Sequence, residues 1–204
     1  MRKLNREFYN RNSLIVAKEL LGKYLVNNIE GTQFIGKIVE VEAYMGPDDK
    51  AAHSYNNRLT ERTKIMYGDA GHAYVYFIYG MHFCMNVVVE AKGKPQAVLI
   101  RALEPVSPKE EMAKRRYGKT LEELKRSELI SITNGPGKLC KAMGISKENN
   151  GEDLCGDNLY ITQGEEQDNF NMVSTKRINI DYAEEAKDYP WRYYIENNPY
   201  ISKK

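Results

Sequence analysis

The sequence predicts an α+β protein with a largely antiparallel sheet and a single domain over residues 1–204. The chain has 204 residues, of which 42% are hydrophobic and 28% charged, which is typical of one globular domain. Segments with the two-residue periodicity of strands gather in the first half of the chain, and short turns join several of them. Segments with helix-start signals follow in the second half, and this order favours the α+β class.

The first half contains one predicted helix and five predicted strands. Residues 13–21 form a helix that Asn12 or Ser13 caps and Gly22 ends. Between residues 45 and 70 the chain is polar and interrupted by glycines, which predicts a long loop with room for one short helix. The predicted strands are residues 23–28, 33–44, 73–79, 82–89 and 97–103.

Three helix starts follow in the second half. Residues 107–110 (SPKE) and 120–123 (TLEE) fit the capping-box pattern, and Pro108 stands at the first helical position of the former. Residues 134–137 (NGPG) open a third helix that ends at Gly144. The rest of the chain combines polar loops with short predicted strands at 158–162, 177–180 and 191–195.

The composition argues against several classes of protein. No apolar run approaches the roughly 20 residues of a membrane helix. The first residues lack an apolar signal core, so we expect a cytoplasmic protein with no membrane partner. The net charge of +2 means that any basic patch must be local. The three cysteines and three histidines form no CxxC or HExxH spacing, which argues against a metal site.

Tyrosine outnumbers phenylalanine by 15 to 5, and several tyrosines gather in the strand predicted at 73–79. Side chains alternate along a strand, so Tyr74 and Tyr76 share one face. Tyr79 and Met81 then stand at the tip of a tight hairpin, where apolar side chains are unusual. Such a tip can wedge between base steps of DNA, fold back onto a loop or contact a partner, and the residues alone leave these alternatives open.

Two carboxylates share a face of the strand predicted at 33–44. Glu40 and Glu42 are two residues apart, so their Cα atoms are roughly 6.5–7 Å apart. That is near the lower end of the separation, about 6.5–9.5 Å, at which paired carboxyl groups activate water in glycoside hydrolysis. The alternative is a solvated strand face with two ordinary glutamates.

Three further polar side chains stand in unusual positions. Arg101 shares a strand face with apolar residues, so it requires a partner, which a strand glutamate or a phosphate would provide. Lys138 follows a helix N-terminus that favours anions, although a plain glycine–proline helix start explains the same residues. Asn86, on a half-buried strand, requires hydrogen-bond partners or a ligand.

Four blocks of the chain together resemble the alkyladenine (3-methyladenine) DNA glycosylases, the family typified by the mammalian enzyme. They occur in the family's order and at its spacing, and the resemblance extends over residues 13–195. His82 replaces a tyrosine of the mammalian hairpin, and residues 146–175 match poorly. The blocks are residues 42–54 (EAYMGPDDKAAHS), 74–86 (YVYFIYGMHFCMN), 99–105 (LIRALEP) and 135–140 (GPGKLC).

The resemblance implies a single mixed domain around a curved antiparallel sheet, with a hairpin that projects from it and inserts into DNA. It implies that Glu42 is the general base that positions water, while Glu40 has a supporting role. The other implied roles are a pocket for an extruded base (Tyr44, His53, Tyr76 and Asn86), insertion into the duplex (Tyr79 and Met81) and a phosphate contact (Arg101). With Arg101, we expect Arg58, Arg62 and Lys138 to form the local basic patch on the DNA backbone.

The implied activity is base-excision repair of duplex DNA bound through the minor groove. The enzyme would flip out 3-methyladenine, 7-methylguanine, hypoxanthine or ethenoadenine and hydrolyse the N-glycosidic bond, leaving an abasic site. No lysine shares the strand face of Glu42, so we expect a monofunctional hydrolase without a lyase step. We expect no metal and no cofactor, and a monomer that acts on the nucleoid in the cytoplasm.

Two other functions use some of the same residues. A non-catalytic protein that binds damaged DNA would explain Tyr76, Tyr79 and Arg101, but a carboxylate such as Glu42 beside DNA would only repel it. A nucleoside hydrolase would use Glu42 and the tyrosines, but it has no need of an exposed hairpin tip. We therefore favour the glycosylase.

Overall fold

Strand β2 (Thr32–Tyr44) carries the paired glutamates and lies in the middle of the sheet. The structure is a computed structural model that describes residues 2–164 and 169–203. Within this part of the chain the sheet has eight strands in the order β3-β4-β5-β2-β1-β6, with β8 paired to β2 and β7 paired to β8. Every one of these pairings is antiparallel. The predicted α+β class and antiparallel sheet are confirmed.

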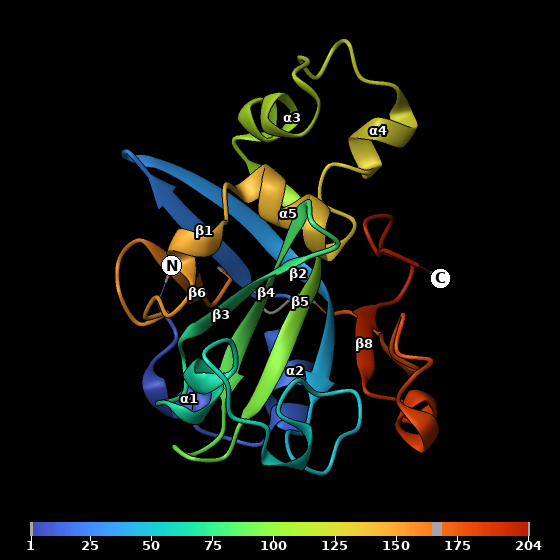
Figure 1. The fold of residues 1–204 in the computed structure, drawn as a ribbon. Helices are drawn as coiled ribbons and strands as arrows, with labels where there is room; N and C mark the ends of the chain where they lie inside the picture. The colour runs from blue at the N-terminus through green and yellow to red at the C-terminus, as the bar shows by residue number, and fades with distance from the viewer. Residues whose placement is uncertain (1, 165–168, 204) are drawn as a thin grey trace.

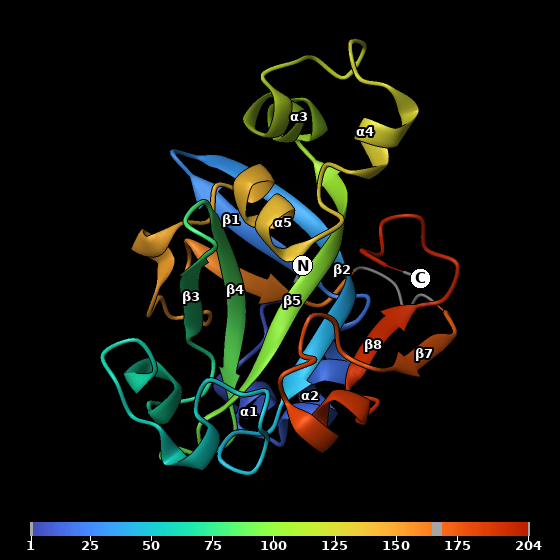
Figure 2. The same ribbon diagram turned by 45° about the vertical axis from the view of Figure 1, so that its right-hand side comes forward.

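Two strands share one edge of β2, because β2 is long. Its first half pairs with β1 (Tyr24–Ile29), while Glu40–Glu42 pair with β8 (Arg192–Ile195). Its other edge pairs with β5 (Gln96–Ser107), and the register shifts on both sides of Glu40. Figure 2 shows β8 beside β2, away from β3 and β4. The remaining strands are β3 (Ala73–Ile78), β4 (His82–Val89), β6 (Leu159–Thr162) and β7 (Met172–Thr175).

Short helices cover the sheet and its ends. The α-helices are α1 (Arg6–Tyr9), α2 (Ser13–Leu20), α3 (Lys109–Tyr117), α4 (Arg126–Ile130) and α5 (Pro136–Met143). The 3₁₀ turns are Tyr55–Asn57, Lys64–Tyr67, Lys147–Asn149 and Glu184–Asp188. Helix α2 packs on β2 and β5, while α5 packs on β4 and β5. Figure 1 shows α3 and α4 projecting beyond the end of the sheet.

The two faces of the central strands have different roles. One face of β2 buries Val39, Val41 and Ala43 in the main apolar core, as the alternation predicts. The opposite face carries Glu40 and Glu42, which are also fully buried: Arg192 and Ser202 bind Glu40, and the main chain at Ile178 binds Glu42. The solvated strand face is therefore excluded.

Several predicted elements are confirmed, and others require correction. The helix at 13–20 is capped by Asn12, whose side chain accepts a hydrogen bond from the Leu14 N–H. The strand expected at 97–103 extends to Ser107. The helix expected at the capping box of 107–110 begins at Lys109, after the strand, and its Glu110 carboxylate accepts the Leu121 N–H instead.

Two other elements differ more. At 120–123 the Thr120 N–H and hydroxyl both bond Glu123, but only a turn forms there, and α4 begins at Arg126. The strand expected at 177–180 is absent, and the strand in this part of the chain is β7, at Met172–Thr175. The physical reason is that Arg177 and the Ile178 N–H bond to buried carboxylates rather than to a neighbouring strand.

Among the described residues, no helix is long and apolar enough to cross a membrane. No group of three or more potential metal ligands occurs in that part of the chain either.

Candidate active site

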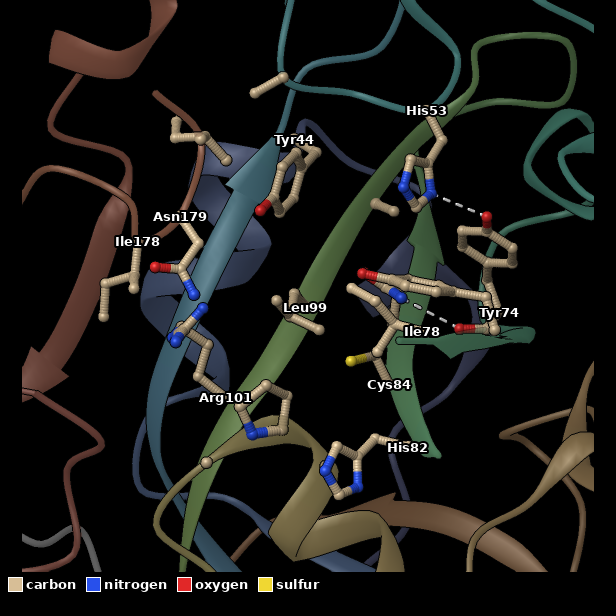
Figure 3. A pocket seen from close by; sticks show the side chains of 18 of the residues that line it. Tyr44, His53, Tyr74, Ile78, His82, Cys84, Leu99, Arg101, Ile178 and Asn179 are labelled. Carbon is tan, nitrogen blue, oxygen red and sulfur yellow. Dashed lines mark hydrogen bonds between the residues drawn. The ribbon is translucent and has the colours of Figure 1, made fainter. Parts of the chain in front are cut away.

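A cavity of about 390 Å³ opens on the face of β3, β4 and β5 that carries Tyr76, Asn86 and Arg101. Its size is in the usual range for a site that holds a small organic group. Figure 3 shows side chains converging on it from the sheet, from the loop that holds His53, from α5 and from the segment that contains Ile178. The lining includes Tyr44, His53, Tyr74, Tyr76, Ile78, Tyr79, His82, Cys84, Asn86, Leu99, Arg101, Lys138, Ile178, Asn179 and Tyr182.

Glu42 lies directly behind the wall of this cavity. Its Oε2 accepts a hydrogen bond from the Tyr44 hydroxyl at 2.9 Å, and its Oε1 accepts the Ile178 N–H at 2.8 Å. The Nη1 of Arg101 is 3.2 Å from the same Oε1. All three donor residues line the cavity, whereas the Glu42 side chain is fully buried. A carboxylate offers about four acceptor positions, so one remains after these three donors.

Glu40 differs from Glu42 in its hydrogen bonding. Its Oε1 accepts from Arg101 Nε at 3.3 Å, from Arg192 Nε at 2.7 Å and from the Ser202 hydroxyl at 2.8 Å. Its Oε2 accepts the Ser202 N–H at 2.5 Å. Three of these donors reach Oε1 and one reaches Oε2, so Oε2 of Glu40 keeps an acceptor position, as Oε2 of Glu42 does. The two glutamates differ in their surroundings: all three partners of Glu42 line the cavity, whereas Arg192 and Ser202, which bind Glu40, do not.

Arg101 lies between the two glutamates and is itself almost fully buried. Burial alone lowers the pKa of an arginine, but the charges of Glu42 and Glu40 outweigh it and raise the pKa of Arg101. The sequence left two partners open for Arg101, a strand glutamate or a phosphate, and in the structure Arg101 pairs with the strand glutamates Glu40 and Glu42. Arg101 also lines the cavity, so the phosphate contact stays a prediction.

The aromatic wall of the cavity consists of Tyr74, Tyr76 and His53. The rings of Tyr74 and Tyr76 have centroids 5.4 Å apart, and His53 meets Tyr76 edge-on at 4.7 Å. The Nδ1 of His53 is 2.9 Å from the Tyr74 hydroxyl (Figure 3). Arg62 lies over the Tyr76 ring at 4.7 Å, and its Nε donates to the Tyr74 hydroxyl. The wall is therefore a fixed assembly.

His53 should make folding stability depend on pH. Burial first, and the Arg62 and Arg58 charges second, lower its pKa from 6.5 to about 4. Between these values the unfolded chain takes up a proton that the folded chain does not, so the contribution disfavours folding as the pH falls from 6.5 to 4. We expect the thermal midpoint of the wild type to fall more steeply over this range than that of His53→Gln. Parallel slopes would show that the pKa of His53 is the same in the folded and unfolded chains.

The hairpin tip does not fold back onto a loop. Tyr79 is 74% and Met81 68% exposed, so of the three alternatives only insertion into DNA or contact with a partner remain. Tyr79 has a φ of 53°, in the region that favours glycine. The start of β4, next to the tip, packs closely on α5, because a Cβ on Gly137 would lie 2.9 Å from the Cβ of His82.

The other predicted site residues occupy distinct positions. Asn86 is buried, and its Nδ2 donates to the Tyr74 carbonyl, so one of its hydrogen-bond requirements is satisfied within the sheet. Lys138 donates to Asn134 Oδ1 at 2.8 Å, and burial lowers its pKa. Arg58 lies with Arg62 on a second, smaller cavity that also borders His53.

Sequence reasoning missed the residues that close the site. Asp49 and Arg177 form a buried bidentate ion pair at 2.6 and 2.8 Å. This pair holds the main chain that presents the Ile178 N–H to Glu42 and places Asn179 at the cavity (Figure 3). Asp49 lies within one of the resembling blocks, whereas nothing in the sequence near Arg177 indicates its partner, 128 positions away.

Comparison with known proteins gives consistent matches over the chain. A family model described as methylpurine-DNA glycosylase matches residues 7–199. A candidate 3-methyladenine DNA glycosylase of Desulfitobacterium hafniense (strain Y51) is 56% identical over 204 residues, with both chains covered in full. A second candidate 3-methyladenine DNA glycosylase, from Alkaliphilus oremlandii (strain OhILAs), is 59% identical over 202 residues, which cover 99% of this chain and 100% of the other. One of Clostridium novyi (strain NT) is 58% identical over 204 residues, again with both chains covered in full.

These matches define the class of protein first: a DNA glycosylase, a hydrolase that acts on N-glycosyl bonds in DNA repair. Within that class, the chain belongs to the methylpurine-DNA glycosylase family. The resemblance stated from the four sequence blocks is thereby confirmed, and DNA is the partner that this family implies. The non-catalytic binding protein and the nucleoside hydrolase are correspondingly disfavoured.

Proposed function

We propose that the protein removes alkylated and deaminated purines from duplex DNA as a monofunctional hydrolase, with Glu42 as the general base. The proposed substrates are 3-methyladenine, 7-methylguanine, hypoxanthine and ethenoadenine. The observation that carries the proposal is the difference between the two buried glutamates. Glu42 keeps an acceptor position and all three of its partners line the cavity, whereas Glu40 is bound by Arg192 and Ser202, which do not line it.

The chemistry follows from this arrangement. Hydrolysis of an N-glycosidic bond develops positive charge on the sugar, which a buried carboxylate stabilises strongly because little water screens it. The same carboxylate accepts a proton from the attacking water. The Tyr44 hydroxyl, the Ile178 N–H and Arg101 hold Glu42 in one orientation, so that its remaining acceptor position has a fixed direction.

The aromatic side chains support binding of an extruded base. Removing a base from the duplex costs a few kcal/mol, and stacking on one aromatic ring returns about 1–3 kcal/mol. Tyr44 and Tyr76 line the cavity, with His53 and Asn86 beside them. The electron-rich faces of tyrosine favour the positive charge of an alkylated purine.

The surface around the cavity supports contact with the minor groove. Tyr79 and Met81 are the exposed apolar tip that would fill the gap in the base stack. The basic residues proposed to contact the DNA backbone are Arg58, Arg62, Arg101 and Lys138, all of which line the cavity or its smaller neighbour. We propose that a monomer carries out the reaction.

A duplex with one ethenoadenine or hypoxanthine tests the proposal. The protein is incubated with the labelled duplex in EDTA, and half of each sample is then treated with hot alkali. Strand scission only after alkali is expected, because hydrolysis leaves an abasic site without cutting the chain. Scission without alkali would contradict the monofunctional reaction, and loss of activity in EDTA would contradict a reaction that depends on Glu42 alone.

Replacing Tyr79 by glycine should weaken binding without loss of stability. Glycine adopts the φ of 53° more readily than tyrosine, so the thermal midpoint should not fall. Loss of one stacking ring should weaken affinity for the ethenoadenine duplex by about 5- to 150-fold, equivalent to 1–3 kcal/mol. Fluorescence anisotropy measures this affinity. Ile15→Ala, at an exposed apolar residue on α2, is the control, and equal affinities of both variants would exclude insertion by Tyr79.

A further inference from the structure

Residues 201–203 cover Glu40, and the proposed reaction gives this contact no role. Ser202 supplies two of the four hydrogen bonds to this carboxylate, through its N–H and its hydroxyl. The carbonyl of Lys203 accepts a hydrogen bond from Arg192 Nη2. Figure 1 shows this last part of the chain beyond β8, on the side of the sheet edge where β8 pairs with β2.

Four buried charges alternate from this segment to the proposed base. Arg192 pairs with Glu40, Glu40 pairs with Arg101, and Arg101 pairs with Glu42. Glu40 and Glu42 are fully buried, and the exposed fractions of Arg101 and Arg192 are 7% and 4%. Two carboxylates and two guanidinium groups sum to zero, as a buried cluster requires. Removing one member therefore leaves an unbalanced charge beside Glu42.

The position of Arg101 decides how many acceptor sites Glu42 keeps. An arginine with a single buried carboxylate as its partner favours a bidentate pair, which uses both oxygens. Here Nε of Arg101 faces Glu40 while only Nη1 faces Glu42. Glu40 thus holds the guanidinium to one side. Without it, Arg101 would turn onto Glu42 and occupy the acceptor position that a water molecule needs.

We propose that Glu40 and Ser202 are positioning residues for the glycosylase reaction, acting through Arg101 on Glu42. The segment 201–203 locks Glu40, Glu40 fixes Arg101, and the fixed Arg101 leaves one acceptor position of Glu42 open. This inference rests on the proposed role of Glu42 as general base. It assigns a function in the reaction to a segment that contributes no residue to the cavity lining.

The test measures the single-turnover rate and the duplex affinity separately, with the ethenoadenine duplex as the probe. For Glu40→Gln we expect a rate lower by about 10²-fold, the effect of a small misplacement of catalytic groups, with affinity within about twofold of the wild type. Ser202→Ala loses the hydroxyl that donates to Glu40 and accepts a long hydrogen bond, 3.5 Å, from Arg101 Nη2, and it should lose about fivefold in rate. Ser202→Thr keeps the hydroxyl and should recover the rate.

Two controls separate this role from general stability. Glu104→Ala removes a different hydrogen bond of the same part of the chain, the one from Asn198, leaves the bond from the Tyr200 N–H to Asn198 in place, and should leave rate and affinity unchanged. Thermal unfolding of every variant shows whether lost rate follows lost stability. If Glu40→Gln does not fold, the comparison of alanine, threonine and serine at position 202 still decides the question.

The outcomes are distinct. A wild-type rate for Glu40→Gln and Ser202→Ala, alongside an inactive Glu42→Gln, would overturn the positioning role and leave the proposed function intact. Equal losses of affinity and rate would also overturn it, because they indicate a collapsed cavity. An active Glu42→Gln would instead contradict the proposed function itself. Movement of the Arg101 Nε–H resonance in Ser202→Ala, observed by NMR, is the expected structural signature.

Discussion

Replacing Glu42 by glutamine is expected to slow base release by about 10³-fold, within the range that general-base catalysis contributes. The substitution keeps the shape of the side chain and removes its charge and basicity. The amide oxygen still accepts from the Ile178 N–H and Arg101, and the amide nitrogen can donate to the Tyr44 hydroxyl oxygen in place of the present bond. The cavity should therefore persist, with affinity for the ethenoadenine duplex unchanged.

Single-turnover assays with alkaline cleavage measure the rate, and anisotropy measures the affinity. Glu104→Gln is the matched control, because Glu104 is a glutamate of the neighbouring strand β5 that accepts a hydrogen bond from Asn198 and does not line the cavity. A Glu42→Gln protein that releases the base at the wild-type rate would show that another group activates the water.

The sequence was sufficient to predict the elements whose signals are local. The strands of the β3–β4 hairpin, the cap at Asn12 and the helix start at Pro136 follow from alternation and from residue preferences that the structure retains. The capping-box pattern at 120–123 forms only one of its two hydrogen bonds, from the Thr120 N–H to Glu123, while the Thr120 hydroxyl donates to the same carboxylate, and a turn stands there in place of a helix. A local pattern thus predicts local hydrogen bonds better than the length of an element.

The contacts that complete the site depend on distant residues, which a single sequence does not pair. Both partners considered for Arg101 fit its position in the strand, and only the fold shows that two glutamates from β2 reach it. The same holds for the segment 177–180, whose apolar alternation resembles a strand. The Ile178 N–H instead donates to Glu42, because Arg177, the residue before it, is held by its ion pair with Asp49.

Breaking the Asp49–Arg177 pair is expected to destabilise the protein by about 3–5 kcal/mol, since it leaves a buried charge without its partner. Both side chains are fully buried, and the guanidinium has the Tyr44 ring on one side and the Trp191 ring on another, at 4.8 and 5.0 Å. In Asp49→Asn the amide cannot accept both N–H groups of Arg177. Urea unfolding at neutral pH measures the loss.

The neighbouring Lys176–Asp188 pair provides the control, because both of its side chains are more than half exposed. Asp188→Asn should leave the urea midpoint unchanged, since solvent already satisfies these charges. A similar midpoint for Asp49→Asn and Asp188→Asn would contradict the large contribution expected of the buried pair.

A double replacement separates the contribution of this pair to stability from its contribution to the site. In Asp49→Leu with Arg177→Met no unpaired charge remains, so much of the stability lost in Asp49→Asn should return. The hydrogen bonds from Arg177 to the Ala43 and Ala186 carbonyls are still missing. Without them the Ile178 N–H is no longer held against Glu42. We therefore expect a folded protein with a low rate of base release, and a double variant with the wild-type rate would show that the buried pair serves stability alone.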